Sequence, residues 1–145
     1  MTAINEFMTA HHKHCDELFI QAEAAVEKEL WDEASEKWKL FSAELEKHFQ
    51  REEGVLFPEF ESATGMTAGP TQMMRMEHQQ MRAIVMEMDN SCENKDKLGY
   101  MGLSETLMVT MQQHNMKEEQ ILYPMTDNSI ADADGIINEM QSQEK

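Results

Sequence analysis

Residues 114–124 of the chain read His-Asn-Met-Lys-Glu-Glu-Gln-Ile-Leu-Tyr-Pro, and residues 48–58 read His-Phe-Gln-Arg-Glu-Glu-Gly-Val-Leu-Phe-Pro. Both stretches contain a histidine, a glutamate pair that begins four residues later, and then a leucine, an aromatic residue and a proline. Residues four apart lie on the same face of an α-helix. Each stretch therefore presents one imidazole and one carboxylate toward a common point. The two pairs are His48 with Glu52 and His114 with Glu118.

Each pair lies within an apolar stripe whose members are three or four residues apart, as expected for a helix that faces a core. The stripes comprise Ala34, Trp38, Phe41, Leu45, His48, Glu52 and Val55, and Leu103, Leu107, Met111, His114, Glu118, Ile121 and Met125. A buried carboxylate needs a partner, because its desolvation is costly. A hydrogen bond to the histidine would explain one pair. The repetition instead favours two metal ions, and iron is the leading candidate for imidazole and carboxylate ligands.

Composition limits the classes of function. The 145 residues fit a single domain, 1–145, that is long enough to bury a core. The formal net charge of −16 argues against binding to nucleic acid or to an anionic membrane surface. We expect no membrane span, because no apolar run approaches about 18 residues, and no signal peptide. Two cysteines, Cys15 and Cys92, are too few for a disulfide framework. These features together predict a cytoplasmic protein.

Helical periodicity dominates the chain, and it predicts an all-α, up-down-up-down four-helix bundle. The bundle should span about residues 2–125, and residues 126–145 should form a tail or a short C-terminal helix. The predicted helices run over about 2–29, 32–53, 70–90 and 98–123. Asp32 is the expected N-cap of the second helix, and Pro70 suits the first position of the third. Pro124 should end the fourth helix.

The first and third helices also carry histidines. His78 lies in the middle of the apolar line Thr71, Met74, His78, Met81, Val85 and Met88. The first helix offers three histidines, His11, His12 and His14, and periodicity alone does not choose between them. We expect one of the three to point inward and the others to lie at the surface or beside the ligands.

These four elements, in this order, resemble a hemerythrin-like (HHE cation-binding) domain of bacterial type over about residues 1–125. The family pattern is one histidine on the first helix, His-x-x-x-Glu on the second, one histidine on the third and His-x-x-x-Glu on the fourth. Family members carry apolar residues five and four positions before the first ligand and three, six and seven after it. Phe7, Met8, Cys15, Leu18 and Phe19 match that spacing only if His12 is the ligand. The resemblance therefore implies the metal ligands His12, His48, Glu52, His78, His114 and Glu118.

The resemblance further implies a di-iron centre in which two histidines bind each iron. Glu52 and Glu118 would bridge the two ions, with an oxo or hydroxo group as a third bridge. An open position at each iron would accept a small ligand, which could be dioxygen, nitric oxide or peroxide. We expect Glu53 and Glu119 to face solvent or to support the ligands from behind. The fifteen methionines could suggest copper, but they follow core stripes, as a flexible apolar residue does.

One departure from the family pattern concerns oxygen transport. Oxygen-carrying hemerythrins have a second histidine on the third helix, four residues from the first, where this chain has Met74 and Arg82. The chain thus resembles the four-histidine, two-glutamate variants that sense iron, respond to nitric oxide or repair iron clusters. We expect a protein that binds or senses dioxygen, nitric oxide or iron, in oxidative or nitrosative stress or in iron handling. The alternative is a di-iron enzyme of ferroxidase, peroxidase or nitric-oxide-reducing type. A tyrosine near the irons would favour that alternative, but Tyr100 and Tyr123 are both expected toward helix ends.

Overall fold

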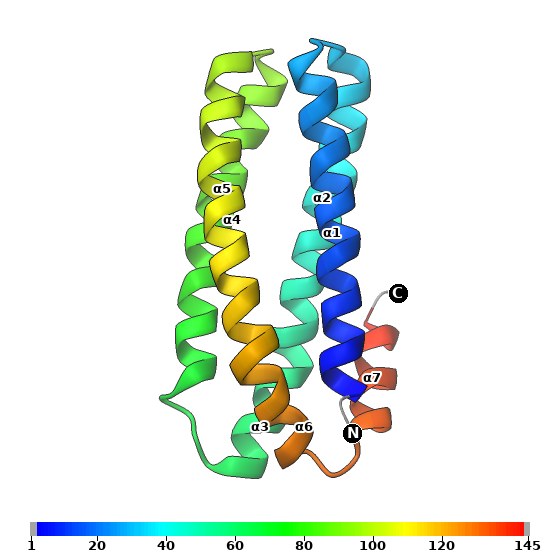
Figure 1. The fold of residues 1–145 in the computed structure, drawn as a ribbon, viewed down its shortest axis with the longest axis vertical. Coiled ribbons are helices and arrows are strands. Elements are labelled where there is room, and N and C mark those ends of the chain that lie inside the picture. The colour runs from blue at the N-terminus through cyan, green and yellow to red at the C-terminus, as the bar shows by residue number, and fades with distance from the viewer. Residues whose placement is uncertain (1–2, 144–145) are drawn as a thin grey trace.

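The computed structural model describes residues 3–143, and within that range every regular element is a helix. Four long helices form the body of the molecule and run alternately up and down (Figure 1). They are α1 (Ala3–Glu27), α2 (Trp31–Arg51), α4 (Pro70–Glu93) and α5 (Lys97–Lys117). The predicted all-α four-helix bundle is confirmed, although the predicted first residue of the first helix, Thr2, lies outside the described range.

The helices pack in two pairs, α1 with α2 and α4 with α5, and contacts of α1 with α5 and of α2 with α4 close the bundle. The C-terminal segment forms α7 (Ala133–Ser142), which packs against α1 near one end of the bundle (Figure 1). The predicted short C-terminal helix is therefore confirmed. Within the described residues, no helix is long and apolar enough to cross a membrane.

The two helices that carry the repeated stretches both pass through a π-helical turn. The turn η1 (Glu52–Leu56) leads from α2 into α3 (Phe57–Thr64), and η2 (Glu118–Leu122) leads from α5 into α6 (Tyr123–Ser129). In both turns the first residue after the turn, Phe57 or Tyr123, donates its N–H to a carbonyl five residues earlier. A proline is the second residue after each turn, and a wider turn relieves the clash of its ring with the preceding backbone. The prediction that Pro124 ends the fourth helix is therefore wrong.

The connection between α1 and α2 also differs from the prediction. Glu29 adopts a left-handed conformation with φ of 57°, which ends α1 sharply. The N-cap of α2 is Leu30, and Asp32 lies in the first turn of the helix instead of capping it. A carboxylate in the first turn still stabilises the helix through its dipole. The prediction of Asp32 as N-cap is wrong by two positions.

The apolar core falls into two clusters. One contains Phe19, Trp38, Phe41, Met81, Met88, Leu107 and Met111, and the other contains Ile4, Met8, Leu56, Phe60, Leu122, Tyr123 and Met140. Along α1, His11 and His12 separate Met8 of one cluster from Cys15 of the other. The histidines and glutamates thus form a buried polar layer between two apolar regions.

The π turn in η2 changes which residues face the core beyond Glu118. Ile121, which the α-helical stripe placed in the core, is 57% exposed, whereas Leu122 is only 1% exposed. A π turn contains one more residue than an α turn, so the buried face moves on by one position. The prediction for Ile121 is wrong for this reason.

Candidate metal centre

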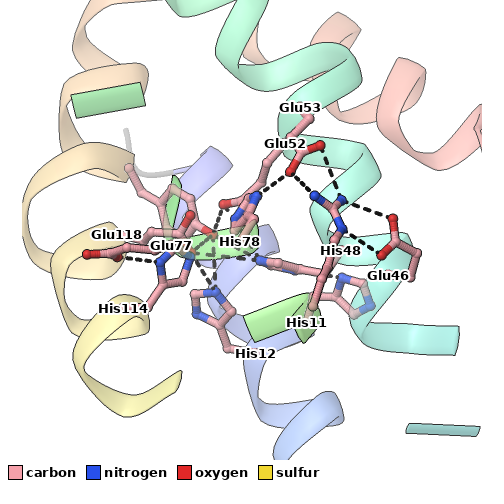
Figure 2. A network of polar contacts seen from close by, with 12 residues as sticks. His11, His12, Glu46, His48, Glu52, Glu53, Glu77, His78, His114 and Glu118 are labelled. Carbon is pink, nitrogen blue, oxygen red and sulfur yellow. Dashed lines mark hydrogen bonds and ion pairs between the residues drawn. The ribbon is translucent and has the colours of Figure 1, made fainter. Parts of the chain in front are cut away.

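The six side chains predicted as metal ligands lie together in the buried polar layer (Figure 2). None of the six is more than 4% exposed. Two groups of donor atoms can be distinguished, each compact enough to surround one cation. The first contains Glu52, His78, His114 and Glu118, and the second contains His12, His48 and Glu118.

In the first group, His78 Nε2 lies 2.9 Å from Glu52 Oε1, and His114 Nε2 lies 3.3 Å from Glu118 Oε1. The 2.9 Å contact lacks hydrogen-bond alignment, and four buried atoms of the group have no hydrogen-bond partner: Glu52 Oε1, His78 Nε2, His114 Nε2 and Glu118 Oε2. Buried polar atoms are nearly always paired. Four nitrogen and oxygen atoms that have no hydrogen-bond partner within one compact group therefore fit a cation bound among these side chains.

In the second group, His12 Nε2 lies 3.0 Å and His48 Nε2 lies 3.9 Å from Glu118 Oε1. Glu118 belongs to both groups. Glu52 extends toward both as well, because its Oε2 atom lies 3.7 Å from His48 Nε2 while its Oε1 atom faces His78. Both carboxylates are therefore placed between the two groups.

Three of the four histidines are held from behind by a glutamate at Nδ1. These contacts join His12 to Glu119 at 2.6 Å, His78 to Glu53 at 2.6 Å and His114 to Glu77 at 2.7 Å. A carboxylate only accepts hydrogen bonds, so each Nδ1 carries the hydrogen and each Nε2 is directed at the centre. Such carboxylate–histidine pairs are the usual support of a metal-binding imidazole. Glu53 and Glu119 thus support the histidines, one of the two roles expected for them.

His48 is held differently, because its Nδ1 atom lies 3.0 Å from the Nδ1 atom of His11. His11 in turn places its Nε2 atom 2.8 Å from Glu44 Oε2. Burial and the neighbouring His48 lower the pKa of His11 to about 4, so the ring carries a single hydrogen at neutral pH. Glu44 can only accept, so that hydrogen is on Nε2 of His11, and the Nδ1 atom of His11 accepts from Nδ1–H of His48. His48 Nε2 is then free to bind a metal.

The three histidines of α1 therefore have three different positions. His12 points into the centre, His11 contacts His48 behind it, and His14 is exposed. Periodicity left the choice open, and the resemblance to the family, through its spacing of apolar residues, implied His12, which the structure places at the centre. The contacts of His11 with Glu44 and of Glu77 with His114 were not predicted. Each of them joins two different helices, and no pattern within one helix indicates such a pairing.

Tyr123 is a further polar residue at the centre. Its hydroxyl lies 2.7 Å from Glu52 Oε2 and 2.9 Å from Glu118 Oε1, so its single hydrogen can be donated to either carboxylate, and the oxygen lies 3.2 Å from Nε2 of both His12 and His48. Burial and the two carboxylates raise its pKa well above the usual value. Tyr123 does lie at a helix end, as the first residue of α6, but its hydroxyl still reaches the centre, so position along the helix did not indicate its distance from the site. On a regular α-helix it would point about 140° away from Glu118, but the π turn brings the two side chains to the same side.

Strong ion pairs hold the layer together when no cation occupies it. Burial acts to lower the pKa of His12, but hydrogen bonds to Glu118 and Glu119 outweigh it and raise the pKa to about 10. Burial also acts to lower the pKa of His78, but the carboxylates of Glu52 and Glu53 beside the ring outweigh it and raise the pKa to about 9. Metal ions must displace these protons, because only neutral imidazole binds them.

The chain matches the family model of the hemerythrin HHE cation-binding domain over residues 3–126. The protein therefore belongs to this family, which confirms the resemblance seen in its sequence. No curated protein matches the chain significantly, and no solved structure does so either. The family and the buried histidine–glutamate groups together indicate a protein that binds metal cations.

Proposed function

We propose that the protein binds two iron ions and through them binds or senses dioxygen, nitric oxide or peroxide, or responds to iron supply. The observation that carries this proposal is the direction of four imidazoles. Every Nε2 faces the two buried carboxylates, and every Nδ1 has a partner that fixes the ring. The proposed ligands are His12, His48, Glu52, His78, His114 and Glu118.

Two features support a dinuclear iron site. The donors are imidazole nitrogens and carboxylate oxygens, a combination that suits iron. Glu118 belongs to both donor groups, and Glu52 directs one oxygen toward His78 and the other toward His48. Both carboxylates are thus placed to bridge two ions, and six protein ligands leave positions on the ions for a small molecule.

Oxygen-carrying hemerythrins have a fifth histidine on the third long helix, four residues from the first one there, and this chain has Met74 and Arg82 at the two possible positions. Met74 is 3% exposed and belongs to the apolar cluster beside the site. Arg82 binds the carboxylates of Glu46 and Glu53. Neither residue supplies a further imidazole. We therefore propose a binding or sensing role and do not propose oxygen transport.

Iron quantitation tests the proposal. The metal-free chain would be loaded anaerobically with ferrous iron and freed of excess metal, and about two irons per chain are expected. Glu52→Ala and Glu118→Ala should lose most of this iron, whereas Glu105→Ala, an exposed glutamate on α5, should retain it. Full iron occupancy in either site variant would contradict the assignment of the bridging residues. Optical spectra after addition of dioxygen, peroxide or nitric oxide then identify the small ligand.

One observation favours the enzymatic alternative as a second candidate. The Tyr123 hydroxyl is within hydrogen-bonding distance of four proposed ligand residues, and a tyrosine near the metals was the feature expected of an enzyme. An enzyme of ferroxidase, peroxidase or nitric-oxide-reducing type would consume many substrate molecules per site. A binding or sensing protein would react only in proportion to its sites. Assays with ferrous iron, peroxide and nitric oxide in large excess distinguish the two.

A further inference from the structure

We propose that Tyr123 is itself a metal ligand, bound through its phenolate oxygen to the cation held by His12 and His48. This inference rests on the proposed function and assigns one more residue to the same site. It distinguishes the two metal positions, which the repeated sequence pattern would otherwise make equivalent.

The first argument is the number of donors in each group. The group around His78 and His114 has four donor residues, whereas the group around His12 and His48 shares Glu118 and has three. The Tyr123 oxygen lies beside all three members of the smaller group, at 3.2 Å from both imidazole nitrogens and 2.9 Å from Glu118 Oε1. It is therefore placed to add one donor to that group, beyond the carboxylates that the two groups share.

The second argument is the spacing of the atoms. With metal–ligand bonds of about 2.1 Å, donors at neighbouring positions around one ion lie roughly 3 Å apart. The Tyr123 oxygen keeps distances of 2.7–3.2 Å to Glu52, Glu118, His12 and His48. A cation among these atoms can reach the phenol oxygen without a large movement of the ring. Tyr123 is 0% exposed, so the oxygen has no bulk solvent to face instead.

The third argument is a comparison within the chain. Phe57 occupies the position in the first repeat that Tyr123 occupies in the second, and both follow a π turn. Phe57 stacks on His78 with the ring centroids 5.8 Å apart, and Tyr123 stacks on His12 at 5.6 Å. The two rings are thus placed alike, but only the second carries an oxygen. That oxygen is on the side of the smaller donor group.

Binding of a ferric ion would replace the phenolic hydrogen, and the proton would leave to solvent. Phenolate is a known protein ligand of ferric iron, as in the haem site of catalase. A bound cation favours the anionic form of an oxygen ligand, because its charge reverses the local electrostatics. A ferric ion bound to phenolate absorbs visible light through a charge-transfer transition, and excitation in that band enhances the Raman vibrations of the tyrosinate ring.

The test uses the whole chain loaded with two ferrous ions and then oxidised by ferricyanide in the absence of dioxygen. We expect tyrosinate ring vibrations in the resonance Raman spectrum, shifted when ring-deuterated tyrosine is incorporated. The chain has two tyrosines, so a signal that persists in Tyr100→Phe belongs to Tyr123. Tyr123→Phe should lose the signal and still fold, because the first repeat already packs a phenylalanine, Phe57, at the equivalent position.

The outcomes separate this inference from the proposed function. Two irons per chain without a tyrosinate signal would overturn the ligand assignment and leave the di-iron proposal intact. A signal that vanishes in Tyr100→Phe would also overturn it. Failure of the wild-type chain to bind iron at all would overturn the proposed function itself. If Tyr123→Phe does not fold, the wild-type and Tyr100→Phe spectra still decide the assignment.

Discussion

The Nδ1 atoms of His11 and His48 lie 3.0 Å apart, so one of them carries a hydrogen and the other accepts it. Because Glu44 holds the only hydrogen of the neutral His11 ring on Nε2, His48 is the donor. A carboxylate thus determines the tautomer of His48 through an intervening imidazole. The corresponding histidine of the second repeat, His114, receives this support directly from Glu77.

Removal of His11 should therefore weaken metal binding, although His11 is not among the proposed ligands. In His11→Ala the Nδ1–H group of His48 loses its acceptor, so the ring is no longer held with Nε2 toward the centre. We expect metal affinity to fall about 10- to 100-fold, the usual effect of losing such a supporting contact. Competition with a chelator of known affinity measures the change. His14→Ala, at an exposed histidine on the same helix, is the matched control and should leave the metal affinity unchanged. An unchanged metal affinity in His11→Ala would refute the argument.

Stability of the metal-free protein should decrease as the pH rises above about 6.5. The pKa of His12 is raised to about 10 and that of His78 to about 9, both from a usual value of 6.5. A group whose pKa is raised on folding stabilises the folded state fully below its unfolded pKa, and this contribution disappears as the pH passes the folded pKa. Thermal unfolding of the metal-free chain between pH 6.5 and 10 should therefore show a falling Tm.

Two controls separate this effect from the repulsion expected of a chain with a net charge of −16. The double variant His12→Ala/His78→Ala should show a much shallower decline in Tm over the same range. The Tm of the iron-loaded protein should instead rise over this pH range, because rising pH deprotonates the ligands and strengthens metal binding. Equal slopes in the wild type and the double variant would show that these histidines do not cause the decline.

Reaction with dioxygen should be irreversible. A carrier must return bound oxygen intact, and the carriers that the family contains use a fifth histidine that neither Met74 nor Arg82 replaces. We expect the di-ferrous protein to oxidise quickly and not to recover under argon. Stopped-flow absorption followed by deoxygenation measures this, and full recovery of the di-ferrous spectrum over repeated cycles would identify a carrier instead.

The sequence allowed the bundle and the positions of six of the central side chains to be predicted, because those residues follow the α-helical repeat of 3.6 residues. His48 and Glu52 needed only that spacing, whereas His12 was chosen among three histidines through the resemblance to the family. Tyr123 could not be found in this way, because a π turn changes the direction of every residue that follows it. Pro124 predicted only an end of the fourth helix, not a π turn before the proline.

The contacts between side chains on different helices could not be predicted from the sequence pattern either. Glu77 and His11 immediately precede His78 and His12, yet each supports a histidine on a different helix. Such a pairing depends on the rotation of one helix against another, which the periodicity of a single helix does not determine. The same limit applies to Arg82, whose position four residues after His78 gave no indication of its ion pairs with Glu46 and Glu53.

The polar layer that divides the apolar core has a consequence for local opening of the chain. Without metal, the cluster around Met8 and Leu122 is joined to the rest of the bundle through ion pairs instead of continuous apolar packing. Proteins open in cooperative units, and a break in apolar contact is a natural boundary between them. Amide hydrogens of α3, α6 and α7 should then exchange with solvent faster than those in the middle of α2 and α5. Two cations bound across the layer would join the units, and that difference in exchange rate should shrink.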